Sequence, residues 1–121
     1  MAQHIVVVDD DKEIREIITF ALGHHGFEVV AASNGAQLLK QLAVHIPDLI
    51  LLDIMMPGQD GYQIFYTLRT NPLTSHIPVI IMTAHAEDIY ARITSDLGAV
   101  HLTKPFHPLE MVEKVKALLA R

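Results

Sequence analysis

The sequence contains no cysteine, and none of its apolar runs approaches the length of a membrane span. The lack of cysteine excludes disulfide bonds, thiolate chemistry and cysteine-ligated metal sites. The first residues do not show a basic segment followed by a long apolar stretch, so no signal peptide is recognisable. From these absences we expect a cytoplasmic protein that does not enter a membrane.

Positive charge is also scarce. Nine Lys and Arg residues stand against fourteen Asp and Glu, which gives a formal net charge of -5. The basic residues are scattered, whereas a nucleic-acid interface needs them clustered, so we expect no direct binding of nucleic acid. The eight histidines include no pair at the i and i+4 spacing of helical metal ligands, which argues against a histidine-based metal site.

What the sequence does contain is a regular alternation of short apolar runs and amphipathic segments. Its 121 residues fit one domain, which we take as residues 1–121. Five strands alternating with five helices predict an α/β fold, with a doubly wound, five-stranded parallel sheet and right-handed crossovers. We expect the flavodoxin-like strand order 2-1-3-4-5. The expected strands are 5–8, 27–31, 49–52, 77–82 and 100–103. The first expected helix has Asp10 or Asp11 as its N-cap and Glu13 in its first turn, and it ends at His24-His25-Gly26. The other expected helices are 36–43, 61–70, 86–97 and 109–119. Helix 86–97 should be the least firmly anchored, because its apolar spacing is poor.

Polar side chains follow the buried strands at the points where these strands end. Asp53 ends the central apolar run and precedes Pro57-Gly58, while Asp9 and Asp10 follow the first strand. In the expected strand order the ends of strands one and three are neighbours at the switch point of the sheet, where ligands bind in such folds. The three carboxylates should therefore lie together, although an Asp at such a position can also serve only as a turn residue.

Three neighbouring carboxylates repel one another unless a cation binds between them. Oxygen donors without Cys or His ligands are typical of Mg²⁺. Thr83 at the end of the fourth strand and Lys104 after the fifth could complete a cradle for a phosphoryl group. Taken alone, either residue could be an ordinary strand-end side chain. Their joint position beside the acidic residues favours the phosphoryl site.

With these residues in view, the sequence resembles the receiver domains of two-component response regulators (CheY-like) over essentially its whole length. The matching motifs occur in order on the five β/α units. They are Asp9-Asp10, Asp53 to Gly58 with Asp60-Gly61 behind it, Thr83-Ala84, Gly98-Ala99 and Lys104-Pro105-Phe106.

The resemblance implies a phosphorylation-activated signalling switch. Asp53 would accept a phosphoryl group from a sensor histidine kinase or a histidine phosphotransfer protein. The domain would catalyse its own phosphorylation and dephosphorylation without being an enzyme in the usual sense. Lys104 would pair with the phosphoryl oxygens, and the Lys104-Pro105 peptide bond would be cis. The implied Mg²⁺ ligands are Asp10, Asp53, the backbone carbonyl of Met55 and, through a water, Asp9.

The same resemblance implies how the signal leaves the site. Thr83 would move toward the phosphoryl group and change the face formed by the fourth helix, the fifth strand and the fifth helix, which controls a downstream output domain or protein. His101 lies at the switch position that usually holds Tyr or Phe. The segment between Gly98-Ala99 and Lys104 is one residue shorter than the common pattern and lacks its acidic residues. This weakens the inference of a dimer through the charged face of helices four and five, so a phosphorylation-dependent homodimer stays open. Met55 and His85 flank the site at positions that tune dephosphorylation.

Two alternatives belong to other functional classes. A small Mg²⁺-dependent aspartyl phosphatase would need a second acid on the strand-loop of its nucleophile and a substrate cap, and the sequence has neither pattern. An interaction module that cannot be phosphorylated is disfavoured by the joint presence of Asp53, Lys104 and Thr83.

Overall fold

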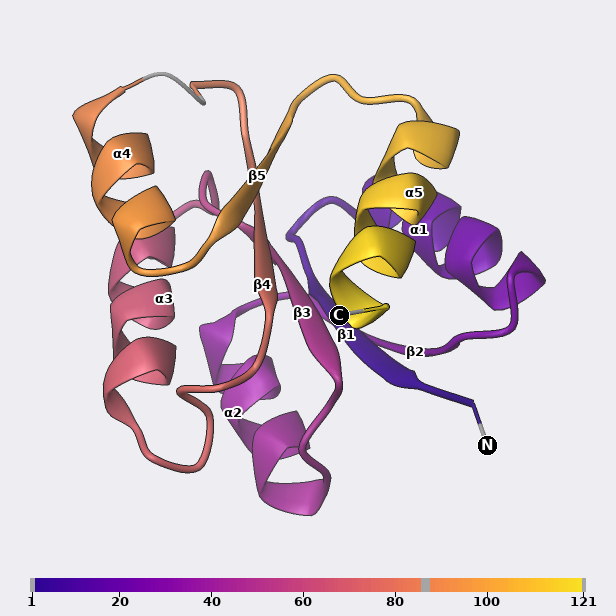
Figure 1. Ribbon diagram of the computed structural model, residues 1–121, viewed down its shortest axis with the longest axis horizontal. Coiled ribbons are helices and arrows are strands. Elements are labelled where there is room, and N and C mark those ends of the chain that lie inside the picture. The colour runs from indigo at the N-terminus through magenta and orange to yellow at the C-terminus, as the bar shows by residue number, and fades with distance from the viewer. Residues whose placement is uncertain (1, 86–87, 121) are drawn as a thin grey trace.

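Five parallel strands form one sheet in the order β2-β1-β3-β4-β5 (Figure 1). This computed structural model describes residues 2–85 and 88–120. The strands are β1 (His4–Val8), β2 (Glu28–Ala32), β3 (Leu49–Asp53), β4 (Val79–Thr83) and β5 (Val100–Thr103). The helices are α1 (Lys12–His24), α2 (Gly35–Val44), α3 (Gly61–Thr70), α4 (Ile89–Asp96) and α5 (Pro108–Leu119). The predicted fold class and strand order are confirmed.

The helices form two layers, one on each face of the sheet. Figure 1 shows α1 and α5 on one face and α2, α3 and α4 on the other. Alternate residues of the central strands point to opposite layers, so both faces are buried and the strands are continuously apolar. Ile50 and Leu52 pack with Phe65 of α3, whereas Leu49 and Leu51 pack toward α1 and α5.

Helix starts are fixed by side-chain caps close to the ends of the strands. The Asp11 carboxylate accepts hydrogen bonds from the backbone N–H groups of Glu13 and Ile14, which begins α1 one turn beyond β1. Asp60 caps α3 in the same way through Tyr62 and Gln63. These caps hold the loops that follow β1 and β3, the loops that carry the predicted site.

Some boundaries differ from those expected. β2 begins and ends one residue later, and β4 begins at Val79 because Pro78 has no N–H to donate to the ladder. The Pro78 carbonyl still accepts a hydrogen bond from Ile50 N–H. α4 ends at Asp96, and its expected start at Ala86 lies outside the described residues.

α4 is weakly buried, as its poor apolar spacing predicts. Within this helix only Ala91 and Thr94 are buried, while Ile89, Tyr90 and Ile93 are exposed. In the part of the chain that the structure describes, no helix is both long enough and apolar enough to cross a membrane.

Candidate functional site

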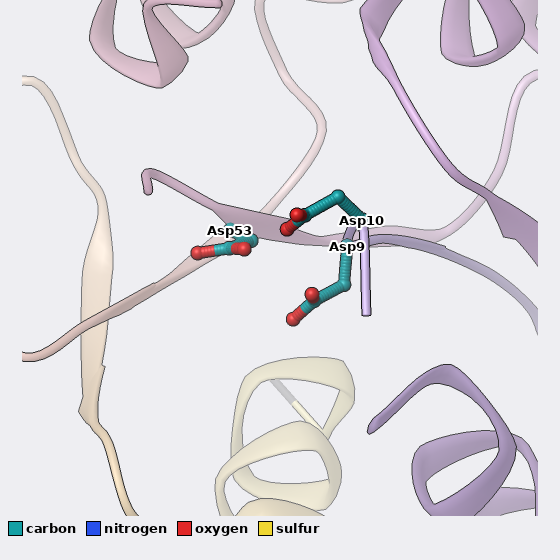
Figure 2. Close-up of side chains that lie close together, drawn as sticks. All are labelled: Asp9, Asp10 and Asp53. Carbon is teal, nitrogen blue, oxygen red and sulfur yellow. The ribbon is translucent and has the colours of Figure 1, made fainter. Parts of the chain in front are cut away.

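The carboxyl edge of the sheet brings together three carboxylates from two strands. Val8 of β1 pairs with Leu52 of β3, so the residues that follow them, Asp9 and Asp53, are neighbours. Asp9 and Asp53 are buried, with 0% and 1% of their surface exposed. Asp10 is exposed, and one carboxylate oxygen from each of the three residues lies within 4.8 Å of the others. Figure 2 shows the three side chains converging.

Lys104 binds two of these carboxylates. Its Nζ lies 3.0 Å from Asp9 Oδ2 and 3.4 Å from Asp53 Oδ1. β4 pairs with β5 through Thr83 and Thr103, which places the next residue, Lys104, at the edge that holds the acidic cluster. Burial alone would lower the pKa of Lys104, but its contacts with Asp9 and Asp53 outweigh burial and raise that pKa, so the ammonium stays charged.

Asp9 is fully engaged by the protein. Its Oδ1 accepts a hydrogen bond of 2.9 Å from Asp11 N–H, and its Oδ2 accepts the Lys104 ammonium. Its backbone carbonyl accepts a further bond from Arg15. Both oxygens of this carboxylate are therefore oriented by donors of the chain itself.

Asp53 is held asymmetrically. Its Oδ1 accepts a hydrogen bond of 3.0 Å from Met55 N–H and also faces Lys104, whereas none of the described residues donates a hydrogen bond to Oδ2. Burial, reinforced by the nearby Asp9 charge, raises the pKa of Asp53 to about 6, against the opposing effects of Met55 N–H and Lys104. One carboxylate oxygen is thus fixed, and the other is free to react or to bind a cation.

Thr83 stands at the end of β4 and is buried. Its Oγ1 accepts a hydrogen bond of 3.0 Å from His85 N–H. Burial raises the pKa of the Tyr62 phenol, and the neighbouring Thr83 hydroxyl opposes this rise, so the two hydroxyls lie near one another. We did not identify Tyr62 from the sequence; the Asp60 cap is the one local signal that places it beside the site.

His101 lies outside the acidic cluster and is bonded to α4. Its Nε2 is 2.9 Å from Thr94 Oγ1, and its Nδ1 is 3.4 Å from Ser95 Oγ. The ring is half-buried rather than turned fully to solvent. Burial lowers the pKa of His101, with Asp88 opposing.

The two flanking residues that the sequence singled out are both exposed. Met55 presents its side chain to solvent while its N–H holds Asp53, and His85 does the same while its N–H holds Thr83. An apolar groove of about 470 Å³ adjoins Lys104 and is lined by Ile14, Ile17, Ala84, Pro105, Phe106 and Pro108. The Lys104-Pro105 bond is cis, as the resemblance implies.

The donor set fits a hard divalent cation. Asp9, Asp10 and Asp53 offer only oxygen, and the sequence has no cysteine that would favour a softer metal. Burial, reinforced by the Asp9 charge, raises the pKa of Asp53, so a bound cation would stabilise its carboxylate form. Mg²⁺ is the ion that such oxygen sites commonly take.

Comparison with known proteins agrees with this geometry. The family model of the response regulator receiver domain matches residues 5–116. The phosphate regulon transcriptional regulatory protein PhoB of Escherichia coli (strain K12) is 40% identical over 122 residues, covering 100% of this chain and 53% of that protein. The transcriptional regulatory protein GltR of Pseudomonas aeruginosa is 37% identical, covering 97% of this chain and 49% of GltR. The chain thus spans about half the length of the curated relatives it matches.

Solved structures give the same result. A putative response regulator from Chloroflexus aurantiacus J-10-fl is 37% identical with a TM-score of 0.88, and each chain is covered to 100%. The receiver domain of the Francisella response regulator 1452 is 30% identical with a TM-score of 0.86, and each chain is covered to 98%. The chain belongs to the response regulator receiver domain family of two-component signalling.

Proposed function

We propose that this domain is a phosphorylation-activated switch in which Asp53 accepts a phosphoryl group from a sensor histidine kinase or a histidine phosphotransfer protein. The observation that carries the proposal is the asymmetric setting of Asp53. Oδ1 is fixed by Met55 N–H and Lys104, and Oδ2 receives no donor from the described residues. Oδ2 is therefore the attacking oxygen.

The chain supplies position and charge for this transfer. The bond between Asp53 Oδ2 and phosphorus forms as the bond from phosphorus to the donor's imidazole nitrogen breaks. Lys104, 3.4 Å from Asp53, pairs with the phosphoryl oxygens and offsets their charge. Mg²⁺, when bound, neutralises further charge on the phosphoryl group and helps to orient it. Because the phosphoryl group is only positioned and its charge neutralised, the transfer does not require an enclosed substrate pocket.

The arrangement of the carboxylates supports specific roles in metal binding. Asp10, Asp53 and the backbone carbonyl of Met55 are the proposed direct ligands. Asp9 already accepts a hydrogen bond at each oxygen, which supports its contact through a water rather than directly. The exposed Asp10 carboxylate, whose oxygen lies within 4.8 Å of the other two, can turn to the ion.

The signal would then pass through Thr83. Its Oγ1 accepts from His85 N–H, and its own proton has no acceptor among the described residues, so a donor is available to a phosphoryl oxygen. Movement of Thr83 would reshape the face of α4, β5 and α5. His101 is part of this face, because its ring ties β5 to α4.

Partners are proposed on the same basis. Lys104, which contacts Asp53, also lines an apolar groove, and this supports the groove as a docking surface for the phosphodonor protein. The relatives PhoB and GltR are transcriptional regulators about twice the length of this chain, which supports control of an output domain or a separate output protein. With a net charge of -5 the domain itself is unsuited to nucleic acid. Family membership supports a cytoplasmic location.

A small aspartyl phosphatase is the weaker candidate. In that class the nucleophile and a second acid share one strand-loop. Here the carboxylates beside Asp53 come from the end of β1 instead. Their position fits acceptance of a phosphoryl group better than repeated turnover of a substrate.

Mass spectrometry after incubation with Mg²⁺ and a small phosphodonor tests the proposal. The parent should gain one phosphoryl group, and Asp53→Ala should gain none. Asp96→Ala is the matched control, because Asp96 is an exposed carboxylate at the end of α4, outside the acidic cluster. Stoichiometric, Mg²⁺-dependent labelling of the Asp53→Ala variant would contradict the assignment.

A further inference from the structure

Tyr62 carries a buried hydroxyl whose role the site does not explain. Tyr62 is the second residue of α3, and its N–H is held by Asp60. Its Oη is buried and has no hydrogen-bond partner among the described residues. Buried polar groups are nearly always bonded, so an orphaned hydroxyl in a native protein calls for a reason.

The neighbour of this hydroxyl is Thr83. The Thr83 hydroxyl lies close enough to Tyr62 to oppose the rise of the Tyr62 pKa. The two hydroxyls do not reach the geometry of a full hydrogen bond in this state. A threonine hydroxyl has one proton and two lone pairs. One lone pair of Thr83 accepts His85 N–H, so the second can accept the Tyr62 proton while the Thr83 proton is donated to another group.

We infer that Tyr62 is a positioning residue that reads the state of Asp53 through Thr83 and transmits it to α4; the inference rests on the proposed function. When Thr83 donates to a phosphoryl oxygen on Asp53, Tyr62 Oη donates to Thr83 Oγ1. Two hydroxyls in series polarise and strengthen each other. The buried phenol completes its hydrogen bond in the phosphorylated state, so its burial favours that state.

The ring of Tyr62 connects this hydroxyl to the surface. It packs against Tyr90 of α4, with ring centroids 5.2 Å apart and planes inclined by 30°. Tyr90 is 58% exposed, and its helix buries only Ala91 and Thr94. A groove of about 180 Å³ between α3 and α4 leaves room for α4 to shift. A movement of Tyr62 therefore displaces the first turn of α4.

His101 acts at a different point on the same helix. Its ring is bonded to Thr94 and Ser95, whereas Thr83 Oγ1 accepts its hydrogen bond from His85 N–H. The link from Thr83 to α4 thus runs through Tyr62 and Tyr90, and His101 anchors β5 to the later turns of α4.

The test compares the parent with Tyr62→Phe, which removes only the hydroxyl oxygen. Tyr66→Phe is the matched control, since Tyr66 lies one turn further along α3 with an exposed side chain. Two readouts are kept separate: phosphorylation of Asp53 by mass, and backbone amide shifts of residues 89–97 by NMR on addition of Mg²⁺ and beryllofluoride, a phosphoryl mimic.

We expect Tyr62→Phe to be phosphorylated within twofold of the parent but to lose more than half of the α4 amide shifts, while Tyr66→Phe keeps them. Tyr90→Leu, which breaks the ring contact, should lose them too. A purely structural role for Tyr62 would not separate the two readouts. Parent-like α4 shifts in Tyr62→Phe, or no α4 shifts in the parent, would overturn the inference while leaving Asp53 as phosphoacceptor. An unlabelled parent would overturn the proposed function and this inference with it.

Discussion

The ionisation of Asp53 is governed by its burial and by the charges of its neighbours. Asp53 is buried beside Asp9, and the Lys104 ammonium forms ion pairs with both carboxylates. The raised pKa of Asp53 shows that burial and the Asp9 charge outweigh Lys104. A site in this condition favours whatever adds positive charge to it, whether a proton or a metal ion.

The first prediction concerns the pH dependence of stability without metal. The folded-state pKa of Asp53 is about 6, above its ordinary value of 3.8, so the folded state binds more protons between these values. The free energy of unfolding should therefore fall as pH rises from about 4 to about 6 and stay low above pH 6. Asp53→Asn should remove this decline and stabilise the metal-free protein at pH 7.5 by roughly 2 kcal/mol.

Urea unfolding across pH 4 to 8 in the presence of EDTA measures this effect. Asp96→Asn provides the control, because it removes an exposed carboxylate of the same type and should leave the pH profile unchanged. Parallel profiles for the parent and Asp53→Asn would show that the burial of Asp53 does not raise its pKa.

At the scale of elements, helices and strands near this site are held together by close backbone contacts and by side-chain hydrogen bonds. The loop after β3 lies directly on the start of α3: a Cβ on Gly61 would come within 2.6 Å of Ile54 Cα and 3.0 Å of the Asp53 carbonyl oxygen. Only a glycine allows α3 to begin so near Asp53. Gly23, inside α1, has no atom within 4 Å of such a Cβ.

The second prediction compares these two glycines. Gly61→Ala should destabilise the domain by roughly 2 kcal/mol, because backbone atoms have to move. Gly23→Ala should stabilise it by about 0.5 to 1 kcal/mol through its better helix propensity. Thermal and urea unfolding measure both variants, and equal effects of the two changes would refute the close-packing argument.

The third prediction concerns the hydrogen bond between His101 of β5 and Thr94 of α4. The Thr94 hydroxyl donates its proton to the Tyr90 or Ala91 carbonyl, so it accepts its bond from His101 Nε2–H, which the neutral ring can supply. Burial, opposed by Asp88, places the folded-state pKa of His101 below its ordinary 6.5. The contribution of His101 to stability is thus fully present above pH 6.5 and is lost as pH falls from 6.5 through the lower folded-state pKa.

This trend has the opposite sign to that of Asp53, so it is measured in the Asp53→Asn background. Adding His101→Phe should flatten the fall in unfolding free energy between pH 7.5 and 5.5, whatever its effect at pH 7.5. If the slope is unchanged by His101→Phe, the ring titrates alike in the folded and unfolded states.

At the scale of the whole molecule, the acidic cluster exists only while β1 and β3 lie side by side. Asp9 and Asp10 are more than forty residues from Asp53 along the chain, and the parallel pairing of Val8 with Leu52 brings them together. The site is therefore a product of the complete sheet, with a helical layer on each face (Figure 1).

The fourth prediction follows from this dependence. Mg²⁺ should bind the folded state and not the unfolded chain, so it should raise the melting temperature in a concentration-dependent way. Asp10→Asn should lower the apparent affinity for Mg²⁺, read from the concentration dependence of this increase, at least tenfold. By relieving repulsion between the carboxylates, it should also raise the melting temperature in EDTA. Asp11→Asn is the control, since Asn is an equally good cap for α1 and Asp11 lies outside the cluster. Parent-like Mg²⁺ binding by Asp10→Asn would exclude Asp10 as a direct ligand.

The sequence by itself determined the elements and the residues at their ends. Apolar runs flanked by turn residues are local signals, and each run delivers its polar residue to the same edge because parallel strands end together. Asp9, Asp10, Asp53, Thr83 and Lys104 were placed at that edge on this basis, and the structure puts them there. The five-fold alternation also fixed the fold class.

Only the tertiary structure decided the contacts across the chain. Which oxygen of Asp53 stays free, how Tyr62 Oη comes to lie beside Thr83, and why His101 binds Thr94 depend on packing between distant segments. Strand edges moved as well, since the start of β4 is set by pairing with β3 and by the missing N–H of Pro78. Local periodicity carries information about elements, whereas side-chain partners across the fold are set by the packing of those elements.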